Sequence, residues 1–142
     1  MLAARRLGLR VAATDRDPHA IGATIADDFA PIDLIDIERT IAWARELGIA
    51  AVATDQTDLP VPTQAAVAEA LGLRGPTPDV ARNATNKRLM RELTSAAGIL
   101  NPNWTALQQT VGWPVKWADP SGPRVVVKPV DNMGSRGVTL VT

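Results

Sequence analysis

Residues 125–141 read VVVKPVDNMGSRGVTLV, two β-branched runs separated by a glycine-rich segment. The runs Val125–Val127 and Val138–Val141 predict two strands joined by a loop. Gly134 and Gly137 permit backbone angles that a side chain would forbid, so successive N–H groups of the loop can turn towards one anion. The stretch therefore predicts a strand, a flexible loop and a second strand.

Positive charge is concentrated in the same stretch. Lys128 ends the first run, and Arg136 lies in the loop between Gly134, Ser135 and Gly137. This combination suits the phosphates of a nucleotide, although a plain β-hairpin with an exposed polar tip explains the pattern equally well. The loop is not a Walker A motif, because no Gly-Lys-Ser/Thr opens a helix. It is not a Rossmann fingerprint either, because a strand rather than a helix follows it.

The composition limits the classes of function. A chain of 142 residues forms one domain or two small ones. The formal net charge is zero, so no global basic field favours nucleic acid or an anionic membrane, and we expect neither as a partner. The chain has no cysteine, which excludes disulfides and thiolate metal sites and fits the reducing cytoplasm in which we expect it. No apolar run approaches the ~20 residues of a membrane span.

The first part of the chain contains a repeat. Residues 4–15 read ARRLGLRVAATD, and residues 44–55 read ARELGIAAVATD. Each copy predicts a helix end, a glycine, a buried strand (residues 10–14 in the first copy) and a Thr-Asp pair at the carboxyl end of that strand. Two such units are typical of a wound α/β domain with a parallel sheet.

The Thr-Asp pairs indicate a candidate substrate edge. Ligands of open parallel sheets bind beyond the carboxyl ends of the strands. Asp15, Asp55 and Thr57 follow the two predicted strands, so we expect them near a common rim. The alternative is that the aspartates only cap turns and helices, as aspartate often does.

Helix signals fill most of the remaining sequence. Capping residues and apolar spacing predict helices over 36–47, 60–71, 79–84 and 86–97, with a Gly/Pro-rich break at 72–78. Asp36 is the expected N-cap of the first of these helices, and Gly48 is its expected stop. A short strand is expected at 104–107. The tryptophans Trp104, Trp113 and Trp117 are close together in the sequence, and core packing is favoured over base stacking for them.

Lys87 lies in the first turn of the helix predicted over 86–97. A cation at this position opposes the helix dipole, which is unfavourable unless an anion is close by. Lys87 is therefore either a phosphate-binding candidate or an ordinary solvated lysine.

The order of these pieces resembles the ATP-grasp superfamily, in particular the carboxylate–amine ligases and the relatives of carbamoyl-phosphate synthase and biotin carboxylase. Residues 7–20, 25–29, 46–73, 86–99 and 125–141 carry the resemblance. It implies an α/β fold in which residues 1–80 are a small preATP-grasp domain with a wound parallel sheet, lacking its first strand. Residues 81–142 would be the amino-terminal part of a truncated α+β ATP-grasp domain.

The resemblance also implies a chemistry. These enzymes use ATP to activate a carboxylate as an acylphosphate, which an amine-type nucleophile then attacks. Lys87 and Lys128 match the two lysines that hold the nucleotide phosphates. Gly134, Ser135, Arg136 and Gly137 match the loop that folds over those phosphates. The family also uses Mg²⁺, whose ligands come from a second subdomain without a counterpart in this sequence, so no metal ligand is expected here.

Because that subdomain has no counterpart, we expect a fragment with little or no ligase activity alone. One alternative is that a complementary ATP-grasp chain completes the enzyme. The other is that the chain is a non-catalytic module that binds a nucleotide or another protein. Residues 138–142 would then form an unpaired, β-branched sheet edge, from which self-association is expected.

Overall fold

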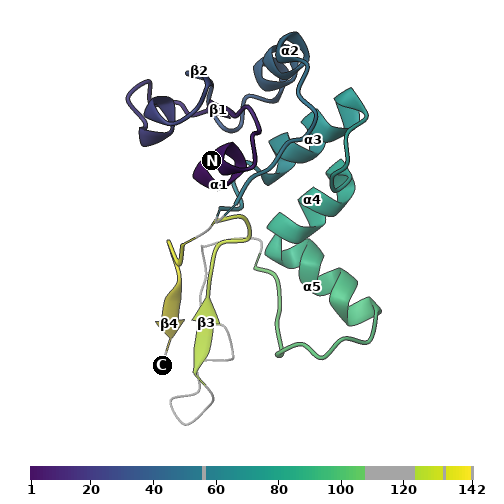
Figure 1. Cartoon of the computed structure of the whole chain (residues 1–142). Helices are drawn as coiled ribbons and strands as arrows, with labels where there is room; N and C mark the ends of the chain where they lie inside the picture. The colour runs from purple at the N-terminus through teal and green to yellow at the C-terminus, as the bar shows by residue number, and fades with distance from the viewer. Residues whose placement is uncertain (56, 108–123, 133, 142) are drawn as a thin grey trace. The chain divides into compact units, whose positions relative to one another are not determined.

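The computed structural model describes residues 1–55, 57–107, 124–132 and 134–141, and Figure 1 shows the order of their helices and strands. The chain divides into two compact units, Met1–Ala81 and Arg82–Thr142. The fold is mixed α/β, with a small parallel sheet in the first unit and an antiparallel hairpin in the second. The roles expected from the resemblance, a preATP-grasp domain for residues 1–80 and the first part of an ATP-grasp domain for residues 81–142, stay predictions.

The first unit contains the parallel pair. After α1 (Leu2–Arg6), β1 (Ala12–Thr14) runs alongside β2 (Asp28–Ala30), with Ala13 opposite Phe29. A parallel pair requires a crossover of about a dozen residues, and the crossover here contains the 3₁₀ helix η1 (Ile21–Thr24). The predicted small parallel sheet is therefore confirmed.

Two details of that sheet were predicted wrongly. The strand expected over 10–14 is confined to Ala12–Thr14 and is half-buried rather than buried. The second copy of the repeat forms no strand at 49–54, and β1 pairs with β2 alone within the part of the chain that the structure describes. A strand requires a hydrogen-bonded neighbour, and an apolar run does not specify one. The carbonyl of Val52 instead accepts from Nε2 of Gln64 at 3.4 Å.

Two packed helices follow the sheet. α2 (Ile37–Leu47) contacts α3 (Val61–Leu71). The carboxylate of Asp36 caps α2 by accepting a backbone N–H of its first turn, as predicted. Gly48 and Gly72 end the two helices in the left-handed conformation, with φ of 61° and 65°.

The core of the first unit is centred on α3. Its buried residues are Thr63, Ala65, Val67 and Ala68, which do not fall on one helical stripe. A helix buried on more than one side occupies an interior position. Most of these side chains are small, which permits the close approach of neighbouring backbone.

Replacing Thr63 by valine is expected to destabilise the first unit by about 1–3 kcal/mol. Thr63 is 5% exposed, and its Oγ1 donates to the carbonyl of Leu34 at 2.6 Å. Valine keeps the shape and leaves that carbonyl without its donor. Urea denaturation would measure the loss, with Thr63→Ser as the control that keeps the hydroxyl. Equal stability of the valine variant and the parent would contradict the prediction.

The second unit combines a helix with a hairpin. α4 (Pro78–Thr85) spans the division between the units, and α5 (Lys87–Ala96) follows it. β3 (Val125–Val127) pairs antiparallel with β4 (Thr139–Val141), as the opening stretch of sequence predicted. Figure 1 shows the two strands side by side.

One face of the hairpin is apolar and open in this structure. Val126 lies opposite Leu140, and these side chains are 56% and 52% exposed. Self-association through the hairpin stays a prediction.

The strand predicted at 104–107 is absent, since these residues form no backbone ladder. Trp104 is half-buried, whereas Trp113 and Trp117 lie outside the described residues. No helix in the described ranges is long and apolar enough to cross a bilayer.

Candidate phosphate-binding site

The loop between β3 and β4 has a left-handed backbone at several positions. Gly134, Ser135 and Gly137 have φ of 62°, 57° and 73°. The N–H of Val138 donates to the carbonyl of Ser135 at 3.2 Å and closes a turn. A left-handed serine costs about 1–2 kcal/mol. Such strain is concentrated at ligand clamps and switch segments, so Ser135 marks this turn as a candidate site.

The end of the loop packs against its beginning. A Cβ placed on Gly137 would lie 2.8 Å from Cγ of Pro129. Pro129 follows Lys128 directly, so this approach brings the glycine turn back to the lysine at the end of β3. Both the positive φ and the lack of space require glycine at position 137.

Replacing Gly137 by alanine is expected to cost about 2–4 kcal/mol locally, because the left-handed strain and the overlap with Pro129 add together. Gly134→Ala is the matched control. It has a similar φ, but nothing lies within 4 Å of the new Cβ. Amide hydrogen exchange of residues 130–138 would compare the two variants. Equal effects would contradict the role of the Pro129 contact.

Lys87 is held against the start of the same loop. Its backbone N–H donates to the carbonyl of Val130 at 2.8 Å. Its ammonium group donates to the carbonyl of Asn132. The structure therefore brings Lys87, at the start of α5, to the segment that follows Lys128, although the two lysines are far apart in the sequence.

The first N–H groups of α5 are already occupied. Oδ1 of Asn86 accepts from the N–H groups of Arg88 and Leu89 at 3.1 and 3.0 Å, and the N–H of Lys87 is bound to Val130. Free N–H groups are what make a helix N-terminus an anion site. An anion bound here would therefore be held by side chains and by the loop.

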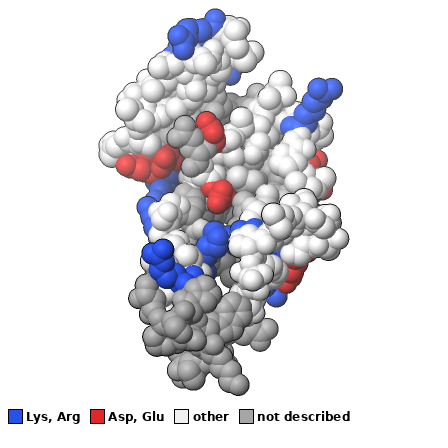
Figure 2. Space-filling view, turned by 90° about the horizontal axis from the view of Figure 1, so that it is seen from below, with Lys and Arg blue, Asp and Glu red and all other residues white. Residues whose placement is uncertain are grey.

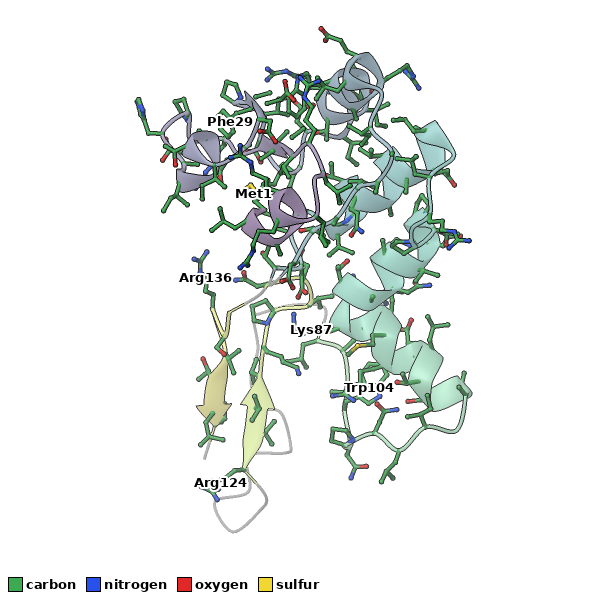
Figure 3. The ribbon with its side chains drawn as sticks, viewed as in Figure 1. Met1, Phe29, Lys87, Trp104, Arg124 and Arg136 are labelled. Atoms are coloured by element: carbon green, nitrogen blue, oxygen red, sulfur yellow. The ribbon has the colours of Figure 1, made fainter. Side chains whose placement is uncertain are left out.

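Two further cations belong to this region. Lys128 and Arg136 are exposed and, in the described part of the chain, have no ion-pair partner. Figure 3 shows Arg136 at the loop end of the hairpin and Arg124 at the opposite end. Figure 2 shows both basic and acidic side chains on the face that it draws.

The predicted substrate edge has less structural support. Oδ1 of Asp15 accepts from the N–H of Asp17 at 2.9 Å, which is the turn-capping role that was the alternative for this residue. Asp55 and Thr57 follow residues 49–54, which form no strand. The argument that placed Asp15, Asp55 and Thr57 on one rim required two strands, so their contact with substrate stays a prediction.

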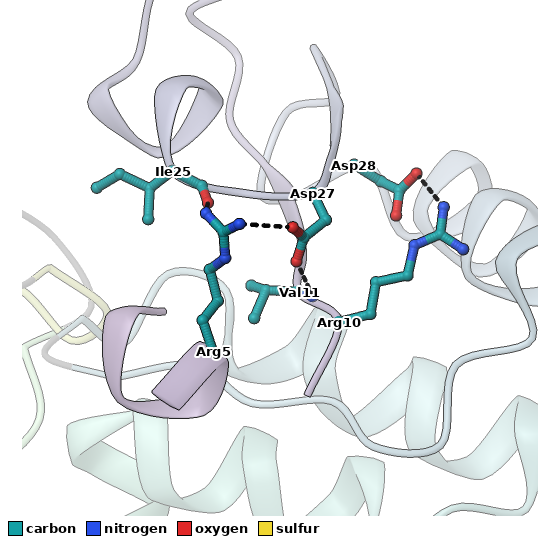
Figure 4. Close-up of polar contacts among 6 residues, drawn as sticks. All are labelled: Arg5, Arg10, Val11, Ile25, Asp27 and Asp28. Carbon is teal, nitrogen blue, oxygen red and sulfur yellow. Dashed lines mark hydrogen bonds and ion pairs between the residues drawn. The ribbon is translucent and has the colours of Figure 1, made fainter. Parts of the chain in front are cut away.

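A second charged cluster lies in the first unit (Figure 4). Arg5 donates to the carbonyl of Ile25 at 2.9 Å and pairs with Asp27 at 3.0 Å, while Arg10 pairs with Asp28 at 2.7 Å. A shallow groove of about 400 Å³ lies beside these groups. Both guanidinium groups already have carboxylate partners, so neither is a free cation for a ligand. The contacts join α1 to the segment before β2, and the segment before β1 to Asp28 of β2.

Comparison with solved structures identifies the fold. The chain matches N5-carboxyaminoimidazole ribonucleotide synthetase from Thermotoga maritima with a TM-score of 0.72 at 20% identity, covering 99% of this chain and 36% of that one. It matches L-amino acid ligase from Bacillus licheniformis with a TM-score of 0.66 at 23% identity, covering 91% of this chain and 33% of that one.

The fold is that of part of an ATP-grasp enzyme. The chain spans about a third of the length of these two structures. No family model and no curated protein matches it. The predicted resemblance to the ATP-grasp superfamily is thus confirmed at the level of the fold.

The described residues around this turn suit an anionic group. Lys87, Lys128 and Arg136 provide positive charge beside an exposed turn. Among the residues that the structure describes, no group of three His, Asp or Glu side chains could hold a metal ion. Mg²⁺ prefers oxygen ligands arranged as an octahedron, so the described residues by themselves do not form a Mg²⁺ site.

Sequence reasoning missed three residues of this site. Asn86 was predicted as part of the helix, whereas it is the N-cap; an asparagine directly before a helical run is the signal that identifies such a cap. Val130 and Asn132 contribute backbone carbonyls. Every residue has a carbonyl, so no sequence signal could have identified these two.

Proposed function

We propose that this chain is the ATP-binding portion of an ATP-grasp ligase that activates a carboxylate as an acylphosphate for attack by an amine-type nucleophile. One observation carries the proposal. In a chain with part of the ATP-grasp fold, Lys87 reaches the strand–loop junction that begins with Lys128. A small-molecule carboxylate and an amine are the proposed substrates, by analogy with the two enzymes that share the fold.

The proposed roles follow from what phosphoryl transfer requires. The reaction depends on alignment and charge neutralisation more than on covalent help from the protein. Lys87 and Lys128 would bind phosphate oxygens, and Arg136 would add a third positive charge from the loop. The N–H groups of Gly134 and Ser135, with their left-handed backbone, would face the same phosphates. Bound ATP supplies the phosphoryl group.

The domain roles belong to the same proposal. Residues 1–80 would act as a preATP-grasp domain, with Asp15, Asp55 and Thr57 towards the substrate. Residues 81–142 would form the amino-terminal part of the ATP-grasp domain. A complementary ATP-grasp chain would supply the rest of the site, including the ligands for Mg²⁺.

The test has two stages. ATP is first titrated into the chain by calorimetry, and saturable binding below millimolar concentration is expected. The chain is then combined with a complementary ATP-grasp half, and phosphate release is measured with candidate carboxylates and amines. Binding without release would favour a non-catalytic nucleotide-binding module. No binding at millimolar ATP would overturn the proposal.

A further inference from the structure

The start of α5 and the start of the glycine loop are joined by a short chain of hydrogen bonds. Asn86 has an extended backbone, with φ of −102° and ψ of 110°, and its side chain accepts from Arg88 and Leu89. Lys87 is the first helical residue, and its N–H donates to the carbonyl of Val130 at 2.8 Å rather than to the helix. Its ammonium donates to the carbonyl of Asn132. Lys87 is thus bound at both its backbone and its side chain.

We infer that Asn86 is a positioning residue for the phosphate site, because its cap makes α5 begin at Lys87 and so holds that lysine against the strand–loop junction. This inference rests on the proposed function. Without an acceptor on residue 86, the N–H groups of Arg88 and Leu89 lose their partner and the first turn frays. Lys87 belongs to that turn, so its distance from the loop would no longer be fixed.

The geometry also shows what a phosphate would change. The backbone bond from Lys87 to Val130 does not involve the ammonium group, so it can persist when a ligand binds. The bond from the ammonium to Asn132 uses the group that a phosphate would require. Because the ammonium group has three N–H donors, a phosphate could bind it beside or in place of the Asn132 carbonyl, while Asn86 and Val130 keep the backbone of Lys87 in place.

The test uses the full chain, ATP as the probe and three substitutions of one residue. Asn86→Ala removes the cap. Asn86→Ser keeps a cap of similar strength without charge, and Asn86→Asp keeps the cap and adds a carboxylate beside Lys87. Calorimetry measures the dissociation constant of ATP, and amide hydrogen exchange measures protection at Lys87, Arg88 and Leu89. Lys87→Ala is the reference for complete loss of the ammonium group.

Asn86→Ala is expected to speed exchange at the three amides and to weaken ATP binding up to about fivefold, since binding must reorder a turn whose cap is worth about 1 kcal/mol. Asn86→Ser is expected to restore both properties. Asn86→Asp is expected to restore protection while binding ATP about twofold more weakly than Asn86→Ser, because the added carboxylate repels phosphate.

Three results would overturn the inference. If Asn86→Ala speeds exchange but binds ATP as the parent does, while Lys87→Ala binds weakly, Asn86 is only a helix cap. If Asn86→Ala leaves the three amides protected, the cap does not hold the turn. If the parent chain itself does not bind ATP, the proposed function fails and the inference fails with it. Calorimetry of the parent chain alone distinguishes this third result from the first two.

Discussion

Replacing Lys128 by alanine is expected to raise the dissociation constant of ATP about tenfold to a hundredfold, since a hydrogen bond to a charged group contributes about 1.5–3 kcal/mol. Lys128 directly follows β3 and precedes Val130 and Asn132, whose carbonyls bind Lys87. It is exposed and has no ion-pair partner in the described ranges. Removing it eliminates a cation that forms no ion pair among the described residues. The fold should therefore persist while affinity falls, which calorimetry and urea denaturation together would show.

Arg124 provides the matched control. It precedes β3, whereas Lys128 follows it, so about 13 Å of extended backbone separates the two cations. Both are exposed basic residues of the same hairpin. Arg124→Ala should leave ATP affinity within about twofold of the parent, because charges at this distance are screened by salt. Equal losses from the two substitutions would mean that ATP responds only to overall charge.

Replacing Gly75 by alanine is expected to destabilise the first unit by about 2–3 kcal/mol. A Cβ on Gly75 would lie 2.7 Å from Cβ of Ala68, which is 2% exposed on α3. Neither atom can rotate away, since both are fixed directly to the backbone. Relief would require the helix and the following segment to separate, which would open the core around α3. A fall in the urea midpoint would measure the cost.

A double-mutant cycle tests the cause of that loss. Ala68→Gly removes the other half of the overlap, at a cost of about 1 kcal/mol for glycine inside a helix. The double substitution should then be more stable than the sum of the two single changes predicts, by about 1 kcal/mol or more. Strict additivity would show that Gly75 is needed for a reason other than its contact with Ala68.

Local signals predicted much of this molecule. Asp36 as the cap of α2, Gly48 at its end, and the hairpin around the glycine loop all depend on residues that are adjacent in the sequence. Capping, left-handed glycine and β-branched runs each act over a few residues. These features are therefore accessible from the sequence alone. Lys87 and Lys128 were selected as phosphate-binding candidates in the same way, from the predicted helix start and the predicted strand end beside them.

The remaining features depend on partners far apart in the chain. Residues 49–54 have the composition of a strand. A strand forms only when it is hydrogen-bonded to a neighbouring strand, and no local sequence pattern identifies that partner. The Gly/Pro-rich segment 72–78 predicted a break after a helix, but its residue types do not indicate how close Gly75 lies to Ala68. The acceptor of the Lys87 ammonium is a backbone carbonyl. Each of these facts is set by tertiary contact rather than by residue type.

The close approach of Gly137 to Pro129 constrains how related sequences can diverge. A rigid ring and a side chain at position 137 compete for the same space, so these two sites cannot mutate independently. Homologues that acquire any other residue at 137 should have first lost the proline at 129. Lineages that keep the proline should retain glycine even where the neighbouring loop positions vary freely.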